Sequence, residues 1–177
     1  IDEDRPDFLP ISPVADDVFD TAQIEPPSRP IRMGDELFFY YTGLKFRSIS
    51  ATGASAIHVS MLRLDGFVSV ETLHAGTLTT RPLVFLGDTL VVNANAHCGA
   101  RVVEALDAKG KVIKGFAVGD CTPITTDSVR HVVNWQSKPD CHLLQGRPIK
   151  LRFHLKKAKL YSFEPQIQHN HYLQSYD

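Results

Sequence analysis

An unbroken aromatic run at residues 38–41, Phe-Phe-Tyr-Tyr, constrains the fold of this chain most strongly. It lies inside a strand-like segment at 36–42, and an alternating segment follows at 56–64. Consecutive side chains of a strand point to opposite faces, so this run places large rings on both faces of its sheet. Two strands cannot bury both faces by themselves. The sequence therefore predicts a strand pair that needs further β-structure around it.

The later part of the chain consists of short strand-like segments separated by turns. A turn at Asp65-Gly66 opens this part, and others follow at 86–88 and 107–110. A turn every 8–12 residues or so is typical of an all-β sandwich or barrel. We expect hairpins joining 77–85 to 89–94 and 101–106 to 111–116, and alternating strands at 129–135, 148–155 and 159–163. In the strand at 148–155 we expect Leu151, Phe153 and Leu155 to face inward, and we expect the single Trp135 to pack in the core rather than to form a sugar-stacking platform. The pattern predicts an all-β chain in which residues 73–163 form a jelly-roll-like β-sandwich.

Composition narrows the possible partners. The 177 residues carry a formal net charge of −1, which gives no electrostatic reason to expect nucleic acid or an anionic membrane. The apolar runs are strand-sized and far shorter than a bilayer span. The chain opens with IDEDRPDF, without an initiator Met or a signal peptide, so we interpret it as a processed chain or an excised piece.

The three cysteines, Cys98, Cys121 and Cys141, leave two alternatives open. In an oxidising compartment, an odd number indicates one internal disulfide and one thiol that is free or links to another chain. In a reducing compartment, the same residues would be small core side chains. No Cys or His spacing is typical of a zinc site.

Residues 1–30 are rich in proline and predict extended coil rather than a regular element. Apolar side chains within this coil, Phe8 and Phe19 among them, favour docking against a folded body. At the other end, residues 164–177 predict a docked tail.

Asp120 and Asp127 flank a loop and form a candidate structural calcium site, although the ligand count is low and a solvated loop is the alternative. No other cofactor and no metal ligand set is expected.

Several segments together resemble a known family. They read DELFFYYTG at 35–43, SAIHVSMLRLDGFVSVE at 55–71 and GRPIKLRFHLKKAKLYSF at 146–163. In order and spacing they resemble the C-terminal part of glycoside-hydrolase-like proteins with a five-bladed β-propeller, of the β-fructosidase and arabinosidase type, with an appended β-sandwich. The resemblance implies that residues 1–72 are the last propeller blade, followed by the sandwich.

The resemblance also implies candidate carbohydrate-binding residues. FDTAQI at 19–24 resembles an aspartate-bearing turn near the propeller axis, which suggests Asp20, although Thr21 and Ala22 replace the usual Ser-Gly. FYYTG resembles an inner-strand motif, which suggests Tyr41 and Thr42. Glycoside hydrolysis needs two carboxylates, and in such enzymes most of the acting acids come from earlier blades. We therefore expect no catalysis by this chain alone and assign no catalytic residue.

Two functional hypotheses follow. The first is the C-terminal portion of a secreted, glycosidase-like protein that supports the propeller or binds glycan, with a second chain carrying the other blades. The second is a non-catalytic, lectin-like or extracellular structural protein that is linked to another chain through an unpaired cysteine. A third hypothesis is an independent sandwich enzyme that uses its histidines, for which the titration of a histidine should be visible in the pH-rate profile.

Overall fold

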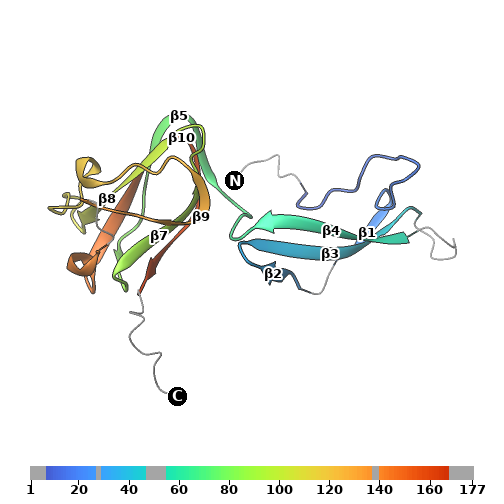
Figure 1. The fold of residues 1–177 in the computed structure, drawn as a ribbon, viewed down its shortest axis with the longest axis horizontal. Helices are drawn as coiled ribbons and strands as arrows, with labels where there is room; N and C mark the ends of the chain where they lie inside the picture. Colours follow the sequence, from blue (N-terminus) through green and yellow to red (C-terminus); the bar gives the residue numbers. More distant parts are fainter. Residues whose placement is uncertain (1–6, 27–28, 47–54, 137–139, 168–177) are drawn as a thin grey trace, which may run out of the picture. The chain divides into compact units, whose positions relative to one another are not determined.

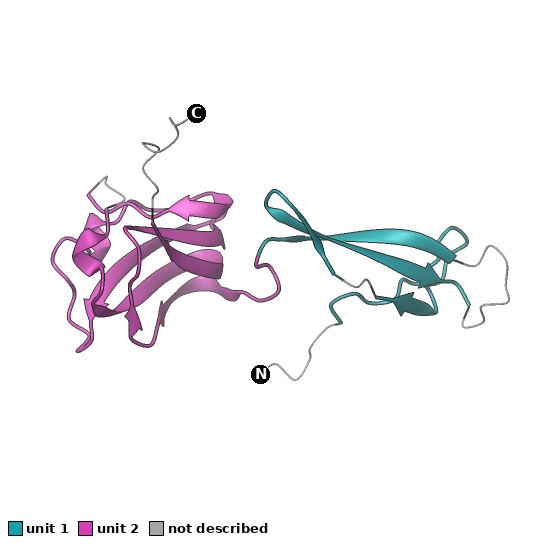
Figure 2. Ribbon diagram, turned by 90° about the horizontal axis from the view of Figure 1, so that it is seen from below, with its two compact units in different colours: residues 1–64 teal, residues 65–177 magenta. Residues whose placement is uncertain are grey.

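The computed structural model describes residues 7–26, 29–46, 55–136 and 140–167. These residues form an all-β structure with two antiparallel sheets, as the turn pattern predicts (Figure 1). The chain divides into two compact units, Ile1–Leu64 and Asp65–Asp177 (Figure 2). Each unit contains one of the sheets, so the units are described separately.

The first unit is organised around one central strand. β3 pairs with β4 along one edge, while β1 and β2 share the other edge. Pro26 and Pro30 lie between β1 and β2 and have no amide hydrogen to donate, so the edge strand is split into two short pieces. The strands are β1 (Gln23–Glu25), β2 (Ile31–Met33), β3 (Glu36–Leu44) and β4 (Ser55–Arg63).

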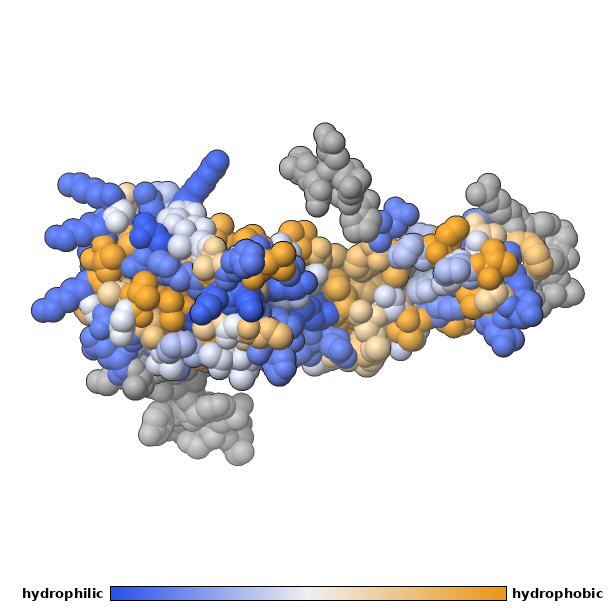
Figure 3. All heavy atoms as spheres, turned by 90° about the horizontal axis from the view of Figure 1, so that it is seen from above, coloured by the Kyte–Doolittle hydropathy of each residue, from blue (hydrophilic) through white to orange (hydrophobic). Residues whose placement is uncertain are grey.

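The two faces of this sheet differ in what covers them. On one face the N-terminal coil covers Phe39, which is 8% exposed and meets the ring of Phe8 edge-on at 5.1 Å. The other face keeps large apolar side chains in contact with solvent. We call this second surface the open face; its exposed members are Ile31, Met33, Tyr40, Ile57, Val59 and Met61. Figure 3, a view from above Figure 1, shows hydrophobic patches between hydrophilic ones on the surface of both units.

The second unit is built on one long strand, β10 (Pro148–Gln166). It pairs with β6 and β5 along one edge and with β8 and then β7 along the other, and β9 pairs with β7. Shifts of register near Lys156 and Leu160 interrupt its pairing. The other strands are β5 (Val70–Thr79), β6 (Leu83–Val84), β7 (Thr89–Asn95), β8 (Ala100–Asp107) and β9 (Asp127–Val132); two single-turn 3-10 helices are η1 (Val118–Asp120) and η2 (His142–Leu144).

The core of this unit follows the alternation in the sequence. Leu151, Phe153 and Leu155 point inward, as predicted, and pack with buried side chains of β7 and β8. The single Trp135 is also a core residue, since it is 3% exposed and its indole N–H donates to the carbonyl of Val103 at 2.9 Å. Its expected role in the core is confirmed.

Several strand predictions are wrong. The expected strands at 148–155 and 159–163 are one strand, because β10 continues through a bulge at which Lys157 has φ 46°. The expected hairpin of 77–85 with 89–94 does not form, since β6 and β7 both pair with β10. Residues 111–116 make turn hydrogen bonds and one bridge to β8 rather than a strand.

The predicted boundary at 72/73 falls inside β5, whereas the compact units divide after Leu64. The jelly-roll arrangement of 73–163 and the blade identity of 1–72 stay predictions. Of the expected tail, residues 164–166 end β10, and residues 168–177 lie outside the described part of the chain. Within the described ranges, no helix has the length and apolarity needed to cross a membrane.

The internal disulfide of the oxidising alternative is absent. None of the three cysteines forms a disulfide: Cys98 is exposed, while Cys121 and Cys141 are buried. Cys121 and Cys141 belong to the hydrophobic core of the second unit, which agrees with the alternative that they are small core residues.

Candidate functional site

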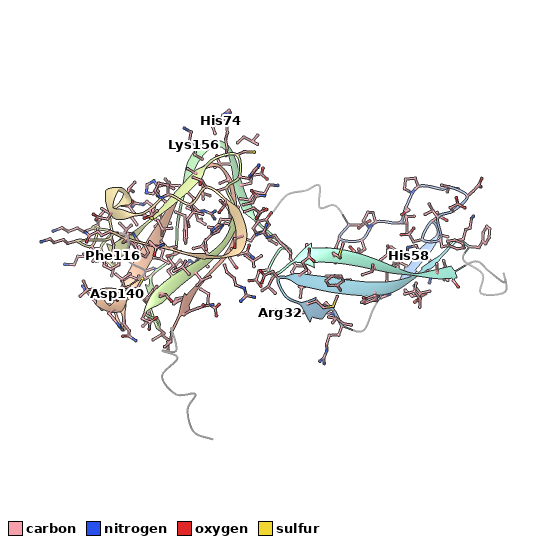
Figure 4. All side chains as sticks on the ribbon, viewed as in Figure 1. Arg32, His58, His74, Phe116, Asp140 and Lys156 are labelled. Atoms are coloured by element: carbon pink, nitrogen blue, oxygen red, sulfur yellow. The ribbon has the colours of Figure 1, made fainter. Side chains whose placement is uncertain are left out.

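A partly buried polar cluster in the first unit brings together Asp20, Tyr41 and His58. Asp20 comes from the coil before β1, Tyr41 from β3, and His58 from β4, where Figure 4 labels it. The Tyr41 hydroxyl donates to Oδ2 of Asp20 at 3.0 Å. Tyr41 and His58 are a cross-strand pair whose rings stack 5.2 Å apart with a 14° angle between their planes. The structure thus joins two of the predicted site residues and adds a histidine.

Gly43 allows Asp20 to approach the sheet. A Cβ at this position would lie 2.6 Å from Cβ of Asp20 and 2.8 Å from Nε2 of His58, both far inside normal contact distance. The missing side chain therefore leaves the space that the aspartate and the histidine occupy together. Asp20 is only 4% exposed as a result.

Backbone hydrogen bonds fix the coil that carries Asp20. Ser12 donates its amide to the carbonyl of Asp20 at 3.0 Å, which closes the segment between them. Ala22 donates to the carbonyl of Leu44 at 3.0 Å, and the ammonium of Lys45 donates to the carbonyl of Asp16 at 2.6 Å. These contacts tie both sides of Asp20 to the segment at the end of β3.

The cluster favours an ionised aspartate. Burial alone raises the pKa of Asp20, but hydrogen bonds from the side chains of Ser12 and Tyr41, together with the charge of nearby His58, hold that pKa below its ordinary value. Burial, the hydrogen bond to Asp20 and the aspartate's negative charge raise the pKa of Tyr41. Tyr41 is therefore held as a neutral donor beside a carboxylate.

Two polar atoms of the cluster lack an internal partner. Oδ1 of Asp20 and Nε2 of His58 are buried and have no hydrogen-bond partner among the described residues. Buried polar atoms usually have a hydrogen-bond partner. A further polar group that bonded to these two atoms would therefore supply the partners they lack. The cluster supplies one carboxylate, whereas glycoside hydrolysis needs two.

Thr42 lies on the other side of the sheet from this cluster. It pairs with Glu25 and Ile57, and its neighbours along β3 alternate between faces, so its side chain belongs with the open face. The three predicted carbohydrate-binding residues are therefore divided between two surfaces. His58 was missed because a single histidine among Ala56 and Ser60 on an alternating strand reads as an ordinary partly exposed residue.

The candidate calcium ligands make hydrogen bonds within the protein. Oδ2 of Asp120 accepts from the amide of Ala117 at 3.1 Å, and its Oδ1 accepts from Nε2 of Gln136 at 3.3 Å. Oδ2 of Asp127 accepts from Nδ2 of Asn95 at 2.9 Å. Among the residues that the structure describes, no group of three or more His, Cys, Asp and Glu side chains is placed to hold a metal ion.

Comparison with known proteins adds no relative. No family model, no curated protein and no solved structure matches this chain.

Proposed function

We propose that this chain is the C-terminal portion of a secreted, glycosidase-like protein, in which the first unit is the last blade of a five-bladed propeller. A second chain carries the remaining blades. The second unit, a sandwich in this proposal, supports the propeller or binds glycan. The chain by itself is not catalytic, because the acids that complete a hydrolytic pair belong to the other blades.

The open face of the first unit is the observation that carries this proposal. Ile57, Val59 and Met61 are 79%, 48% and 60% exposed, and they follow one another along a single face of β4. Contiguous apolar surface of this kind marks an interaction site. A propeller blade packs each face against a neighbour, so a sheet with a second apolar face suits a blade better than a free-standing sheet.

The polar cluster supports the same proposal. An ionised aspartate hydrogen-bonded to a tyrosine offers acceptors and a ring of the kind that sugar pockets use. In the proposed assembly, Asp20 and Tyr41 lie close to the central pocket, and Thr42 lies toward the neighbouring blade. Asp20 then positions Tyr41 and His58 rather than acting as an acid or base.

A second function is favoured by one specific observation, the exposed thiol of Cys98. An accessible cysteine on an extracellular chain can form a disulfide to another chain. That would make the protein a lectin-like or structural component whose partner is covalently attached. Intact mass with and without reductant separates the two functions, because only the disulfide-linked lectin-like or structural protein predicts a partner that reductant releases.

The test is the intact mass of native material, with and without reductant, followed by sequencing of any co-purifying chain. The blade proposal expects a non-covalent partner with further blade repeats.

Ile57→Lys combined with Val59→Lys should abolish the association, because two charges would be buried in an apolar interface. Leu143→Lys is the matched control, since Leu143 is 70% exposed on the second unit. A single species at this chain's own mass in both runs would show that no partner docks and that the chain is a self-contained module.

A further inference from the structure

A second polar site lies on the outer face of the sheet in the second unit, where β10 passes between β5 and β8. His154 pairs with Thr77 on one side and Val102 on the other, and Lys156 pairs with Ala75 and Ala100. Directly opposed residues of neighbouring strands point to the same face. Arg152, His154 and Lys156 therefore stand in a row, flanked mainly by short side chains.

A buried carboxylate orders one end of this row. Oε1 of Glu104 accepts from Nη1 of Arg152 at 3.0 Å and lies 3.0 Å from Nε2 of His154. The Glu104 side chain is 7% exposed, and those of Arg152 and His154 are 35% and 31% exposed. Arg152 also donates through Nε to Oγ1 of Thr79 at 3.2 Å. The imidazole and the guanidinium are thus held in fixed positions.

The other end of the row opens into a groove of about 540 Å³. This volume falls within the roughly 300–1,000 Å³ of small-molecule sites. The groove exists because alanine, glycine and threonine stand where larger residues would fill it. Its lining includes, on the outer face of the sheet, Ala75, Thr77, Ala100, Val102, His154 and Lys156.

The groove is positively charged. Its lining contains arginine, histidine and lysine and, among the described residues, no aspartate or glutamate. Arg101 is fully buried, so the exposed Lys156 is the cation that a ligand meets, with the imidazole of His154 beside it. The carboxylate of Glu104 pairs with the guanidinium of Arg152. It therefore does not compensate the charge of the Lys156 ammonium. A groove lined by charge of one sign concentrates the electric field and attracts ions of the opposite charge, here anions.

We infer that this groove binds an acidic saccharide, with its carboxylate or sulfate on Lys156 and its hydroxyls against His154 and Thr77. The anionic character follows from the groove itself. The saccharide class rests on the proposed function. Lysine acts as a point charge toward such groups, while the fixed imidazole and the threonine hydroxyl offer directional hydrogen bonds.

The test is calorimetric titration of the whole chain at low salt with three tetrasaccharides: tetragalacturonate, a sulfated heparin-derived tetrasaccharide and neutral cellotetraose. We expect one acidic probe to bind at least about tenfold more tightly than cellotetraose. Preference between the two acidic probes distinguishes carboxylate from sulfate recognition. Equal affinity for acidic and neutral probes, or no binding of any probe, overturns the assignment.

Variants locate the binding. Lys156→Gln should weaken the acidic probe at least about fivefold, since it removes the accessible ammonium. Lys109→Gln makes the same change of charge in the turn beyond the opposite end of β8 and should leave affinity unchanged. Ala100→Leu fills the groove without changing charge and should also weaken binding, with circular dichroism confirming its fold. If Lys156→Gln behaves like Lys109→Gln, the groove is not the site. Docking of a partner chain on the open face is tested separately, by intact mass and by the Ile57→Lys and Val59→Lys substitutions. A groove that binds no acidic saccharide therefore does not refute the blade proposal.

Discussion

The hydroxyl of Tyr41 and the carboxylate of Asp20 are joined by a 3.0 Å hydrogen bond between residues that lie 21 positions apart. This contact connects the central strand of the first unit to the coil that covers one face of its sheet. It also places a neutral donor against an ionised acceptor in a buried position. Charge-assisted bonds of this kind are stronger than neutral ones.

Tyr41→Phe should loosen the first unit. The substitution removes the donor and leaves the buried carboxylate with one contact fewer, which costs about 1–3 kcal/mol. Amide hydrogen exchange in β3 and β4, measured by mass spectrometry, should speed up accordingly. Tyr40→Phe is the control, because Tyr40 is 44% exposed on the open face. Equal exchange in both variants would mean that the hydrogen bond does not stabilise the unit.

The stability of the first unit should fall at acid pH because of Asp20. The folded-state pKa of Asp20 lies below that of an unfolded aspartate, which is about 4, so the unfolded state binds the proton first. The stabilisation is therefore present above about pH 4 and is lost as the pH falls through the folded pKa. Protection of β3 measured from pH 7 to pH 3 should decrease more steeply in the native chain than in Asp20→Asn. Asp17→Asn, at an exposed position of the same coil, should keep the native slope.

Gly99→Ala should destabilise the second unit. A Cβ at Gly99 would lie 1.8 Å from the carbonyl oxygen of Lys156, which is backbone of β10 and cannot move aside cheaply. Overpacking of this kind costs about 1–3 kcal/mol. Urea unfolding followed by Trp135 fluorescence measures the effect. Gly119→Ala is the control, since a Cβ there meets nothing within 4 Å, and a comparable loss in both variants would refute the steric account.

Thiol labelling should separate the cysteines. Native protein should react rapidly at Cys98, which is exposed, while Cys121 and Cys141 should react only after denaturation. Burial, with Asp140 nearby, raises the pKa of Cys141 to about 12, so its thiolate is scarce as well as inaccessible. Counting labels with an aromatic disulfide reagent checks this, and Cys98→Ser should remove the rapid phase. A rapid phase that survives this substitution would contradict the assignment.

Local patterns were enough to predict the two long strands of the first unit and the inward face of β10, whereas β1 lies in a segment that was expected to be coil. The paired segments at 36–42 and 56–64 are close to β3 and β4, and Leu151, Phe153 and Leu155 are buried as expected. In β10 the apolar face is buried in the core, whereas in β4 the apolar face is the exposed one, so the period of two predicts the strand but not which face is covered. The pattern of short strands likewise predicts the all-β class.

The partners of strands could not be predicted in the same way. Lys156 and Lys157 interrupt the alternation of apolar and polar residues and suggest a turn. In the structure they form a β-bulge, and the strand continues beyond them as β10. The segments around 86–88 read as a hairpin, but the pairing of β7 with β10 is decided by contacts far apart in sequence. His58 was overlooked for the same reason, because only the register of β3 and β4 sets it beside Tyr41.

The position of β10 in the chain has a consequence for how the protein is made. In the second unit β5, β6, β7 and β8 each pair with β10, while among the strands of the described residues β7 and β9 are the one pair formed without it. During synthesis these earlier strands leave the ribosome before the strand that joins them, so the edges that pair with β10 stay unpaired until residues 148–166 emerge. The first unit has no such dependence, because all four of its strands precede residue 64. Ribosome-bound chains truncated before β10 should therefore contain a formed first sheet and a second unit that needs protection from aggregation.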